Sequence, residues 1–502
     1  MLIQPDTFIR LIKNCPLDNT YRHTLYFDSE ASQVQYFKNT LQGIPFNKQS
    51  YQRFASGVIH VQEKAENLYD CNYLMFQNSA FGNKYFYAFI TEVEYVNNVS
   101  SKVYYEIDVL QTWYFNYELG VSFVEREHSV TDIIGENLVP ENLELGEYVS
   151  SSDGRFTEVQ QLSIVVASTM KIDDEGELNL RPGEMYGRVY SGLYFSVFHA
   201  DSAGVEELKK FIRLDGLLPG GSSIVSIFMM PTAFVTDTLL PKSYFKSIAK
   251  RYGQFGTFTP NNNKLYTYPY NFLYVTNMQG NNAAYPYEFF GEIECTFMLV
   301  GDTSCNPGVI LIPRAYKGLT SNYDESMTLT GFPQCAYTDD AFAAYLSQIA
   351  SAANVSTLAH NVMQNIAGTL SPVTTAIGVA GVLARSVGTL LSPRQSKGVS
   401  NNATLVAAEA LTFEYMNKRI TEEFARIIDG YFDVYGYACH KVKKPNISSR
   451  PHWNYTKTIN CNIIGAIPAS DMSKIKHIFD SGITFWKNGS EVGNYSLDNT
   501  PV

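Results

Sequence analysis

The hydrophobic pattern of the first third of the chain is typical of long β-strands. From Lys84 to Val96, and again from Lys102 to Trp113, apolar residues recur at a spacing of two, with the turn signal Asn97-Asn98 between the two runs. The residues predicted to share a face are Tyr85, Tyr87, Phe89, Val93 and Tyr95 in the first strand and Val103, Tyr105, Ile107 and Val109 in the second. Strands of about a dozen residues exceed the usual five or six, so we expect a long hairpin suited to the wall of a barrel or tube.

The middle of the chain, residues 130–335, is punctuated by Pro, Gly and Asn clusters that separate short periodic runs. Leu162–Ala167 and Ile224–Met230 are predicted strands, whereas the spacing in Val205–Leu214 and Lys242–Tyr252 favours short helices. We expect a second, mixed but mainly β domain here.

The texture changes abruptly at Ala341. From Ala341 to Ala384, 44 residues pass without one Asp, Glu, Lys or Arg. Apolar residues at spacings of three and four predict an amphipathic helix with an uncharged polar face, which Ser371-Pro372 interrupts. The following residues carry a small-xxx-small ridge (Ala376, Ala380, Ala384, Gly388) of the kind that lets apolar helices pack closely.

After this segment the pattern predicts a docking helix over Thr404–Gly430, with Phe413, Met416, Ile420, Phe424 and Ile427 on one face. Strands are expected again at Tyr431–Val442 and Ile483–Trp486. The predicted fold class is therefore mainly β (α+β), with tube-forming hairpin domains from both termini and a helical apolar insertion. The predicted domains are an N-terminal β tube domain (1–130), a mainly β middle domain (131–334), an apolar membrane-active loop (335–402) and a helix with a C-terminal β tube domain (403–502).

Composition supports a folded, β-rich chain. Aromatic residues reach 14% and charged residues only 17% of the 502 residues, and Tyr and Phe favour strands and interfaces. The formal charge of −11 argues against a protein that grips nucleic acid, because such binding rests on neutralising phosphates. The seven cysteines form neither a C-x-x-C pair nor a zinc-like spacing with histidine, which indicates free thiols in a reducing cytoplasm. The N-terminus lacks the layout of a secretory signal.

The uncharged segment has two interpretations. It is either a helical hairpin buried in a large core or a loop that inserts conditionally into a membrane. Its Ala, Gly, Ser and Thr residues would bury little apolar area in a core. The most apolar stretch, Ala376–Ala384, is too short for a constitutive anchor, which needs about 20 residues. We therefore favour conditional insertion, with several copies pooling their polar faces around water.

The residues expected to carry this membrane activity are the apolar and small positions of the segment. They are Phe342, Leu346, Ile349, Leu358, Val362, Ile366, Leu370, Ala376, Ile377, Val379, Ala380, Val382, Leu383, Ala384, Gly388, Leu390 and Leu391. The only charges between Asp340 and Glu409 are Arg385, Arg394 and Lys397, which we expect to contact anionic lipid.

Motifs near both ends resemble a known family. YLMFQNSAFGNKYFYAFITEVEY (Tyr73 to Tyr95), YYEIDVLQTWYF (Tyr104 to Phe115) and FVEREH (Phe123 to His128) resemble the N-terminal part of the tail-knob proteins of short-tailed phages of Gram-positive bacteria, the phi29-like group. YFDVYGYACHKVKKPN (Tyr431 to Asn446) and HIFDSGITFWKNGSEVGNYSLDN (His477 to Asn499) resemble the C-terminal part. The uncharged segment lies where that family carries its long apolar loop and matches it in character, not residue by residue.

The resemblance implies a hexameric tube at the distal end of a virion tail, attached to other tail and collar proteins. Double-stranded DNA would pass down its lumen without specific binding. The apolar loops would plug the tube and then emerge to form a channel in the host cytoplasmic membrane. Residues 130–335 match less well, so the distal part of the knob and its contact with a cell-wall receptor do not follow from the resemblance.

The sequence offers little chemistry for an enzyme or a cofactor. It contains no G-x-x-x-x-G-K-[ST], H-E-x-x-H or G-x-S-x-G motif, and we expect no catalytic residue, no metal and no cofactor. The acidic run at residues 173–175 reads as a solvated loop. A charged strand end explains Lys441, Lys443 and Lys444, beside Tyr437, better than a DNA contact does. We interpret Glu125–His128 as a structural motif, with an ion pair between subunits as an alternative.

Two alternative functions follow from the composition. Tyr and Phe could stack on cell-wall sugars, which would make the chain a receptor- or glycan-binding tail protein. A wall-degrading hydrolase would need a raised-pKa carboxylic acid opposite a second carboxylate, and the sequence offers no preferred pair.

Overall fold

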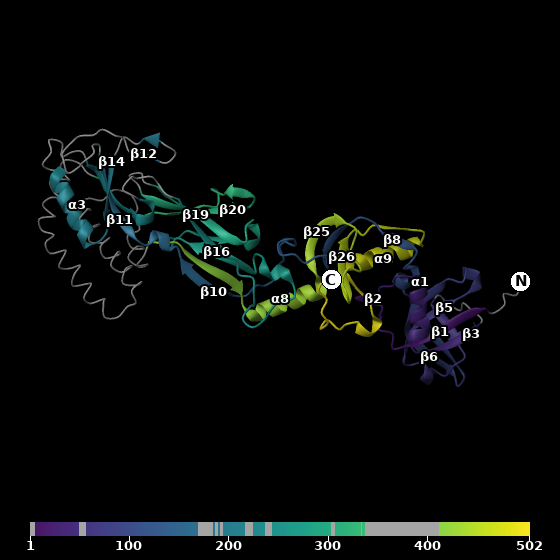
Figure 1. The fold of residues 1–502 in the computed structure, drawn as a ribbon. Helices are drawn as coiled ribbons and strands as arrows, with labels where there is room; N and C mark the ends of the chain where they lie inside the picture. The colour runs from purple at the N-terminus through teal and green to yellow at the C-terminus, as the bar shows by residue number, and fades with distance from the viewer. Residues whose placement is uncertain are drawn as a thin grey trace. The chain divides into compact units, whose positions relative to one another are not determined.

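The computed structural model describes most of the chain and divides it into two compact units (Figure 1). The described residues are 6–49, 57–168, 184–185, 189–190, 194–215, 224–235, 243–302, 307–332, 334–336 and 411–501. Unit 1 consists of Met1–Gly146, Gln254–Leu265 and Glu422–Val502, and unit 2 consists of Glu147–Gly253 and Tyr266–Thr421. Each unit is therefore assembled from segments far apart in the sequence. The predicted domain boundaries at 130, 334 and 402 stay predictions.

Unit 1 begins with a six-stranded antiparallel sheet built from the N-terminal segment. Its order is β3 (Gly43–Gln49), β1 (Thr7–Lys13), β5 (Cys71–Gln77), β6 (Tyr85–Asn97), β7 (Ser100–Ile107) and β4 (Val58–Val61). The predicted hairpin is β6–β7 and is confirmed, although its second strand ends at Ile107 and helix α2 (Val109–Trp113) follows. Asp108 caps this helix by accepting a hydrogen bond from the Gln111 N–H, so Val109 lies outside the strand.

A bulge corrects the predicted face of β6. Tyr87 and Phe89 pack into one core of the sheet, as alternation requires. The pairing with β7 shifts between Ile90 and Glu92, and the extra residue moves Val93 to the opposite core, where it packs beside Val103. Tyr95 is 57% exposed and belongs to neither core. Both faces of β6 are therefore covered near its middle and become exposed toward the hairpin turn.

The second half of unit 1 comes mainly from the C-terminal segment, coloured yellow in Figure 1. A five-stranded sheet has the order β2 (His23–Leu25), β28 (Ile483–Trp486), β26 (Trp453–Ile459), β9 (Ser122–Glu127) and β25 (Tyr437–Lys443). β8 (Tyr117–Leu119) pairs separately with β27 (Ile463–Gly465). Helices α1 (Glu30–Gln35), α8 (Glu422–Tyr435) and α9 (Ala469–Ser481) complete the unit. Trp453 and Trp486 are fully buried and pack with Phe37 and Tyr73, which joins the C-terminal sheet to the N-terminal one.

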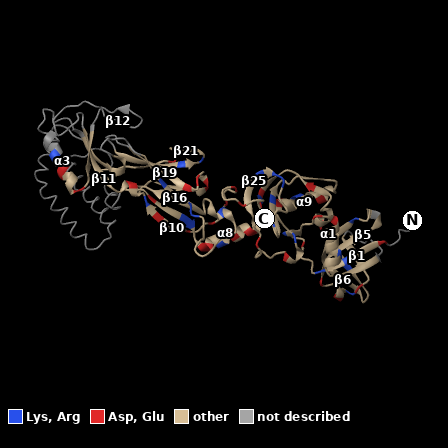
Figure 2. Cartoon of the chain, in the orientation of Figure 1, with Lys and Arg blue, Asp and Glu red and all other residues tan. Residues whose placement is uncertain are grey.

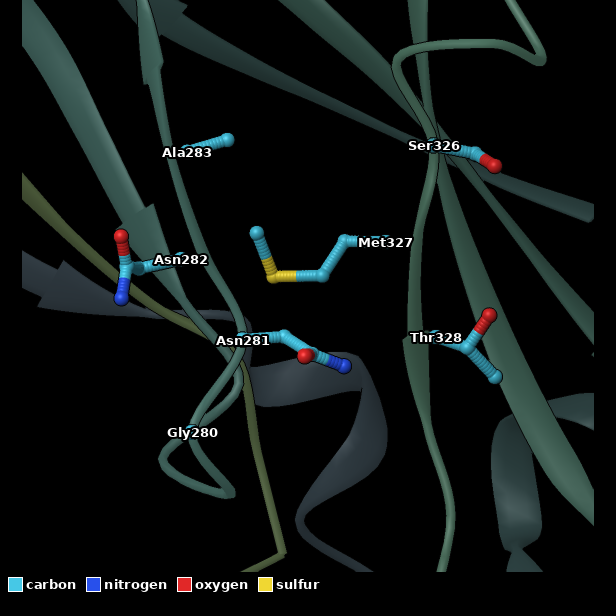
Figure 3. Close-up of a pocket in the computed structure, with 7 residues that line it drawn as sticks. All are labelled: Gly280, Asn281, Asn282, Ala283, Ser326, Met327 and Thr328. Atoms are coloured by element: carbon cyan, nitrogen blue, oxygen red, sulfur yellow. The ribbon is translucent and has the colours of Figure 1, made fainter.

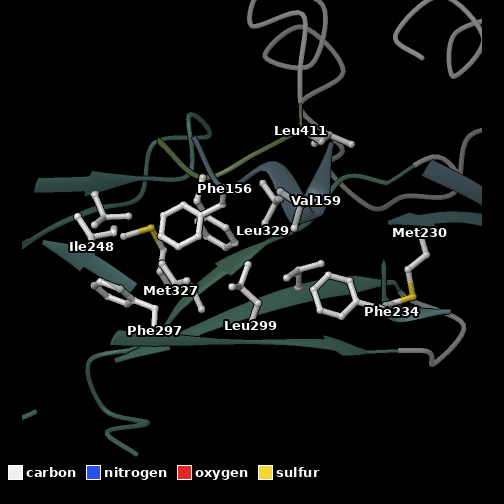
Figure 4. Close-up of a cluster of buried hydrophobic side chains, with 14 of the residues drawn as sticks. Phe156, Val159, Met230, Phe234, Ile248, Phe297, Leu299, Met327, Leu329 and Leu411 are labelled. Atoms are coloured by element: carbon white, nitrogen blue, oxygen red, sulfur yellow. The ribbon is translucent and has the colours of Figure 1, made fainter. Parts of the chain in front are cut away.

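Unit 2 contains three larger sheets around one core. The first has the order β10 (Tyr148–Arg155), β24 (Glu414–Ile420), β17 (Asn271–Thr276) and β18 (Asn282–Tyr285). The second has the order β14 (Tyr194–His199), β11 (Leu162–Ser168), β15 (Ile224–Pro231) and β23 (Gln334–Ala336). The third has the order β16 (Ser243–Ala249), β19 (Glu294–Asp302), β20 (Gly308–Tyr316) and β21 (Leu319–Ser321), and β22 (Met327–Leu329) also pairs with β20. β12 (Glu184–Met185) pairs with β13 (Val189–Tyr190), and α3 spans Ser202–Asp215. Buried side chains from all three sheets, among them Val165, Leu273 and Phe297, form one core. Figure 4 shows part of it, including Phe297 and Phe156, the residue that follows β10.

The middle of the chain bears out most predicted elements. The strands at Leu162–Ala167 and Ile224–Met230 and the helix at Val205–Leu214 are confirmed. The predicted helix at Lys242–Tyr252 is wrong, because Ser243–Ala249 is strand β16, paired with β19 along its length. Only Ile248 of this strand is buried, so its apolar residues were too few to reveal a period of two.

The predicted helix at Thr404–Gly430 is wrong over Glu414–Ile420 and confirmed from Glu422 to Gly430. Glu414–Ile420 is strand β24, hydrogen-bonded to a strand on each side, and the helix begins only at Glu422. That helix continues to Tyr435, so the strand predicted from Tyr431 starts at Tyr437. Its buried face includes Ile428 and Phe432, whereas Ile427 is 61% exposed. The mainly β fold class is confirmed.

Candidate functional site

The predicted membrane-active positions from Phe342 to Leu391, together with Arg385, Arg394 and Lys397, lie outside the described residues. The structure instead shows how the flanks of their segment are held. Among the described residues, no helix is long and apolar enough to cross a membrane.

Both flanks of the segment are fixed within unit 2. On the N-terminal side, β23 pairs with β15, with Cys335 opposite Ile227. On the C-terminal side, Leu411 and Phe413 enter the buried core (Figure 4). The Phe156 N–H donates to the Phe413 carbonyl at 3.0 Å, and the Thr412 hydroxyl donates to the Phe156 carbonyl at 3.1 Å. The chain therefore leaves unit 2 from a paired strand and rejoins it at residues of the buried core.

The C-terminal flank continues into a strand that is central to its sheet. β24 pairs with β10 on one side and β17 on the other. Its buried Asn417 accepts a hydrogen bond from the Tyr287 hydroxyl and donates one to Ser152, so the side chains bridge three segments of unit 2. Displacement of this strand would break two ladders and an amide network, which makes the flank a firm anchor.

Unit 1 holds a second candidate site, a buried polar joint formed by residues 125–141, 261–264 and 429–454. Its centre is the carboxylate of Glu141, whose side chain is 1% exposed. This carboxylate accepts hydrogen bonds from Lys264 Nζ at 2.6 Å, from the Arg126 guanidinium, and from the Ala438 N–H at 2.9 Å. Lys264 also donates to the Val139 carbonyl, and burial lowers its pKa from the ordinary value. One acid thus serves two buried cations.

The run of three asparagines that opens residues 261–264 is bound by helix α8. The Asp429 carboxylate accepts the backbone N–H of Asn261 at 2.9 Å and that of Asn262 at 3.0 Å. The Asn262 side-chain amide donates to Asp429 at 3.0 Å and to Asp433 at 2.7 Å. Burial raises the pKa of Asp429 to about 6 and also raises that of Asp433. The carboxylates of Asp429 and Asp433 are therefore already hydrogen-bonded by donors from unit 1.

The protonation state of His128 can be assigned from its partners. The Tyr455 N–H donates to His128 Nδ1 at 2.7 Å, so this nitrogen carries no proton. His128 Nε2 lies 3.1 Å from the Asp433 carbonyl and must therefore be the protonated donor. Burial lowers the pKa of His128 to about 3, consistent with a neutral ring. The histidine is a structural link in the joint.

The charged motif Glu125–His128 is structural, as expected, and its pairs lie within one chain. Lys457 binds Glu125 at 2.8 Å, and Lys443 binds the fully buried Glu127. Tyr437 is buried and donates its hydroxyl to Asp132 at 2.7 Å, so it has no free face for a nucleic-acid base. A stacking role for Tyr437 beside the lysines is thereby excluded.

A depression of about 570 Å³ lies in unit 2 between the β17–β18 turn and β22 (Figure 3). It is lined by Gly280, Asn281, Asn282, Ala283, Ser326, Met327 and Thr328. None of these side chains is titratable. Side chains also tie its two walls together, since Asn277 donates to the Thr328 carbonyl and Tyr285 donates to the Glu325 carbonyl. The depression is therefore a shallow gap between the β17–β18 turn and the β22 segment, and it offers no titratable side chain for catalysis.

The described residues contain no group of three or more His, Cys, Asp or Glu side chains that could hold a metal ion. The acidic run at residues 173–175 lies outside them. The polar joint itself was not predicted. Its one local signal was the Asn261–Asn263 run, which reads equally well as a turn, because its acidic partners lie about 170 residues away.

Comparisons with known proteins cover nearly the whole chain. Residues 236–500 match the family described as the C-terminal domain of the tail knob protein gp9 of Bacillus phage phi29. Residues 5–118 match the family described as the N-terminus of the caudoviral major tail protein. The tail knob proteins gp9 of Bacillus phage PZA and of phi29 are 27% and 25% identical to this chain, with 98% of each chain covered.

A solved structure has a similar fold. The tail knob protein gp12 of bacteriophage C1 aligns with 99% of this chain and 100% of its own, with a TM-score of 0.64 and 15% identity. At that identity the similarity concerns the fold.

Proposed function

The chain belongs to the tail knob protein family of phi29-like phages and is a structural protein at the distal end of a virion tail; from this premise we propose that six copies form a tube that conducts double-stranded DNA and penetrates the host membrane. The family assignment agrees with the resemblance expected from the sequence motifs. Ring formation, DNA conduction and membrane insertion are the parts that we propose.

The observation that carries the proposal is the charge-free stretch Ala341–Ala384 in a chain that is otherwise acidic. Forty-four residues without a charge are unfavourable in water unless neighbours or lipid cover them. The flanks, β23 and Leu411–Phe413, support the proposal because unit 2 holds the chain on both sides of the segment.

The proposed mechanism is mechanical. Segments from the six copies lie inside the closed tube until DNA displaces them. Outside the tube, their apolar faces transfer into lipid, which the hydrophobic effect favours. The formal charge of −11 per copy suits a conduit, because an acidic wall does not hold phosphate. Arg385, Arg394 and Lys397 would meet the anionic headgroups of the host membrane.

We propose a non-enzymatic role. Asp429 and Asp433 are the paired carboxyls with raised pKa values, yet both accept hydrogen bonds from Asn262 and neither lines the described depression. Incubation of the purified chain with host cell wall tests this role directly. Release of soluble wall fragments above a buffer control would contradict it.

The membrane proposal is tested by dye release from vesicles containing anionic lipid, using the full chain. The wild type should release dye, and Ala380→Asp should release at least about tenfold less, since a carboxylate at the centre of a lipid-inserted helix costs about 2.5–3.5 kcal/mol. Gln62→Asp, an exposed position in unit 1, introduces the same charge and should match the wild type. Equal release by both variants would contradict the proposal.

A further inference from the structure

A row of exposed apolar side chains crosses the C-terminal sheet of unit 1. Val442 on β25 and Ile459 on β26 both lie directly opposite Phe123 on β9, so the three share one face. Val442 is 71% exposed, Ile459 is 47% exposed and Phe123 is 37% exposed. Thr458, the neighbour of Ile459, donates its hydroxyl to Asp480 of α9, so this row points away from that helix. We call it the apolar row.

The apolar row ends at an open sheet edge. Within the described residues, β25 pairs with β9 alone and forms the edge of its sheet. Glu141 occupies this strand near its start, at the Ala438 N–H, whereas His440, Lys441, Val442 and Lys444 are exposed. Lys443 binds Glu127, and no ion pair joins Lys441 or Lys444 to another described residue. Because side chains alternate along a strand, Lys441 and Lys443 lie on one face of this edge and Val442 on the other. Figure 2 shows the charged residues of this region along the backbone.

A second open edge, with the opposite charge, lies on β6 of the same unit. β5 pairs with β6 only as far as Phe89, and beyond that point the described partner of β6 is β7. Glu92 and Glu94 face Tyr104 and Lys102 across the hairpin, so both acids share one face. Lys102 binds Glu94 at 3.0 Å, which leaves Glu92 exposed without a cation among the described residues. Tyr95, Val96 and Val99 add exposed apolar surface near the turn.

The two edges match residue by residue in kind. In sequence, β25 carries Lys441-Val442-Lys443 and β6 carries Glu92-Val93-Glu94. Of these four charged residues, Lys441 and Glu92 form no ion pair with a described residue, whereas Lys443 and Glu94 already do. We infer that the β25 edge of one copy pairs with the β6 edge of a second copy, so that Lys441 faces Glu92 and the apolar row meets the exposed Tyr95 of the neighbour. This inference rests on the proposed tube and names the surfaces that would close it.

A second copy fits better than another partner because one chain carries both complementary edges. Two different patches on the same subunit form a head-to-tail contact, which closes into a ring when the rotation between copies allows. Such pairing would also cover two open strand edges that otherwise invite aggregation. An unrelated protein would need to supply only one edge and would leave the other exposed.

Charge reversal tests the pairing in the full chain. Lys441→Glu and Glu92→Lys should each weaken self-association at least about fivefold, since like charges would then face each other. The double variant, in which every interface again pairs opposite charges, should recover wild-type association. Lys487→Glu, an exposed lysine in the same unit, is the matched control. Analytical ultracentrifugation measures the association, and circular dichroism verifies that each variant is folded.

Cross-linking provides a second measurement that does not depend on weakening the assembly. In a Cys439→Ser background, Tyr95→Cys with Val442→Cys should form covalent chains longer than dimers with a short bis-maleimide. Either cysteine alone should not.

The outcomes separate this interface from the proposed function. An assembled wild type whose charge variants associate normally, or whose double variant fails to recover, would overturn the interface and leave the tube intact. A wild type that stays monomeric at every concentration would overturn both.

Discussion

At the residue scale, burial decides which polar contacts matter in this protein. Glu141 is almost completely enclosed and faces the two cations Lys264 and Arg126. Lys474 and Glu106 also form an ion pair, at 3.4 Å, but their side chains are 57% and 48% exposed. Removal of the Glu141 charge would leave its two cations without a counter-charge away from water, whereas Lys474 and Glu106 are both in contact with water.

We therefore predict that Glu141→Gln destabilises unit 1 by about 3–5 kcal/mol, because two buried cations lose their counter-charge. Glu106→Gln, the exposed control, should change stability by less than ~1 kcal/mol. Urea unfolding followed by tryptophan fluorescence measures both, since Trp453 and Trp486 are buried in this unit. Similar effects for the two variants would contradict a special role for the buried site.

The raised pKa of Asp429 predicts a pH dependence. A folded-state pKa of about 6, above the unfolded value, means that the folded state holds the proton more tightly. The contribution of Asp429 to the free energy of unfolding is fully present below the pKa of the unfolded state, near 4. This contribution is lost as pH rises through the folded-state pKa of about 6. His128, whose pKa is lowered to about 3, acts in the opposite direction over part of this window.

Comparison with Asp429→Asn isolates the contribution of that carboxyl. The wild type should lose up to ~3 kcal/mol relative to the variant between pH 4 and pH 7. Denaturant unfolding at four pH values across this window measures the difference. A difference that is constant with pH would show that Asp429 titrates normally.

The three cations after the uncharged stretch should set the lipid preference. Replacing Arg385, Arg394 and Lys397 together with Gln should weaken binding to vesicles rich in anionic lipid by up to ~3 kcal/mol, about 1 kcal/mol per charge. Binding to neutral vesicles should not change. Vesicle co-sedimentation at two lipid compositions measures this, and an equal loss on both compositions would argue against headgroup contact.

At the scale of elements, the flanks of the uncharged segment are the informative pieces. Phe413 is fully buried between Phe156 and the other side chains of the unit 2 core, and strand β24 starts at the next residue. Phe245, on edge strand β16 of the same unit, is 57% exposed. The two phenylalanines offer a matched comparison of anchor and surface.

Phe413→Ala should therefore destabilise unit 2 by about 3–5 kcal/mol, whereas Phe245→Ala should cost less than ~1 kcal/mol. Limited proteolysis of the two variants across a temperature series measures the difference. Increased cleavage within residues 266–332 is expected for Phe413→Ala alone. Equal resistance of both variants would indicate that the flank is not an anchor.

Local periodicity predicted the elements whose pairing is local. The β6–β7 hairpin follows from alternation and one turn, because its two strands are neighbours in sequence. Its bulge did not follow, since a single extra residue leaves no mark on composition and yet moves Val93 to the other core. The β16 strand was mistaken for a helix because its pairing partner β19 lies about 50 residues away.

The error at Thr404–Gly430 has a different cause. Phe413, Met416 and Ile420 are spaced as in a helix, but this stretch is inserted between β10 and β17, whose ladders decide its conformation. The polar joint was missed for a related reason. Its acids, amides and cations come from three separate segments, so no single window of sequence contains the site.

At the scale of the whole molecule, the two units carry different features. Unit 1 is built from both ends of the chain and carries the polar joint and the two open strand edges, which suit it to assembly. Unit 2 carries both flanks of the uncharged segment. The chain passes between the two units four times, and the uncharged segment belongs to unit 2. Displacement of the segment would therefore leave unit 1 covalently and structurally complete.

We propose that residues 341–391 enter lipid while the rest of the chain does not. The most direct test adds the assembled full chain to vesicles that contain a photoactivatable acyl chain, followed by peptide mapping after illumination. We predict that the label concentrates within residues 341–391 and is at least about tenfold weaker in Ala380→Asp. Labelling spread over the exposed strands of units 1 and 2, or no labelling of this segment, would contradict it.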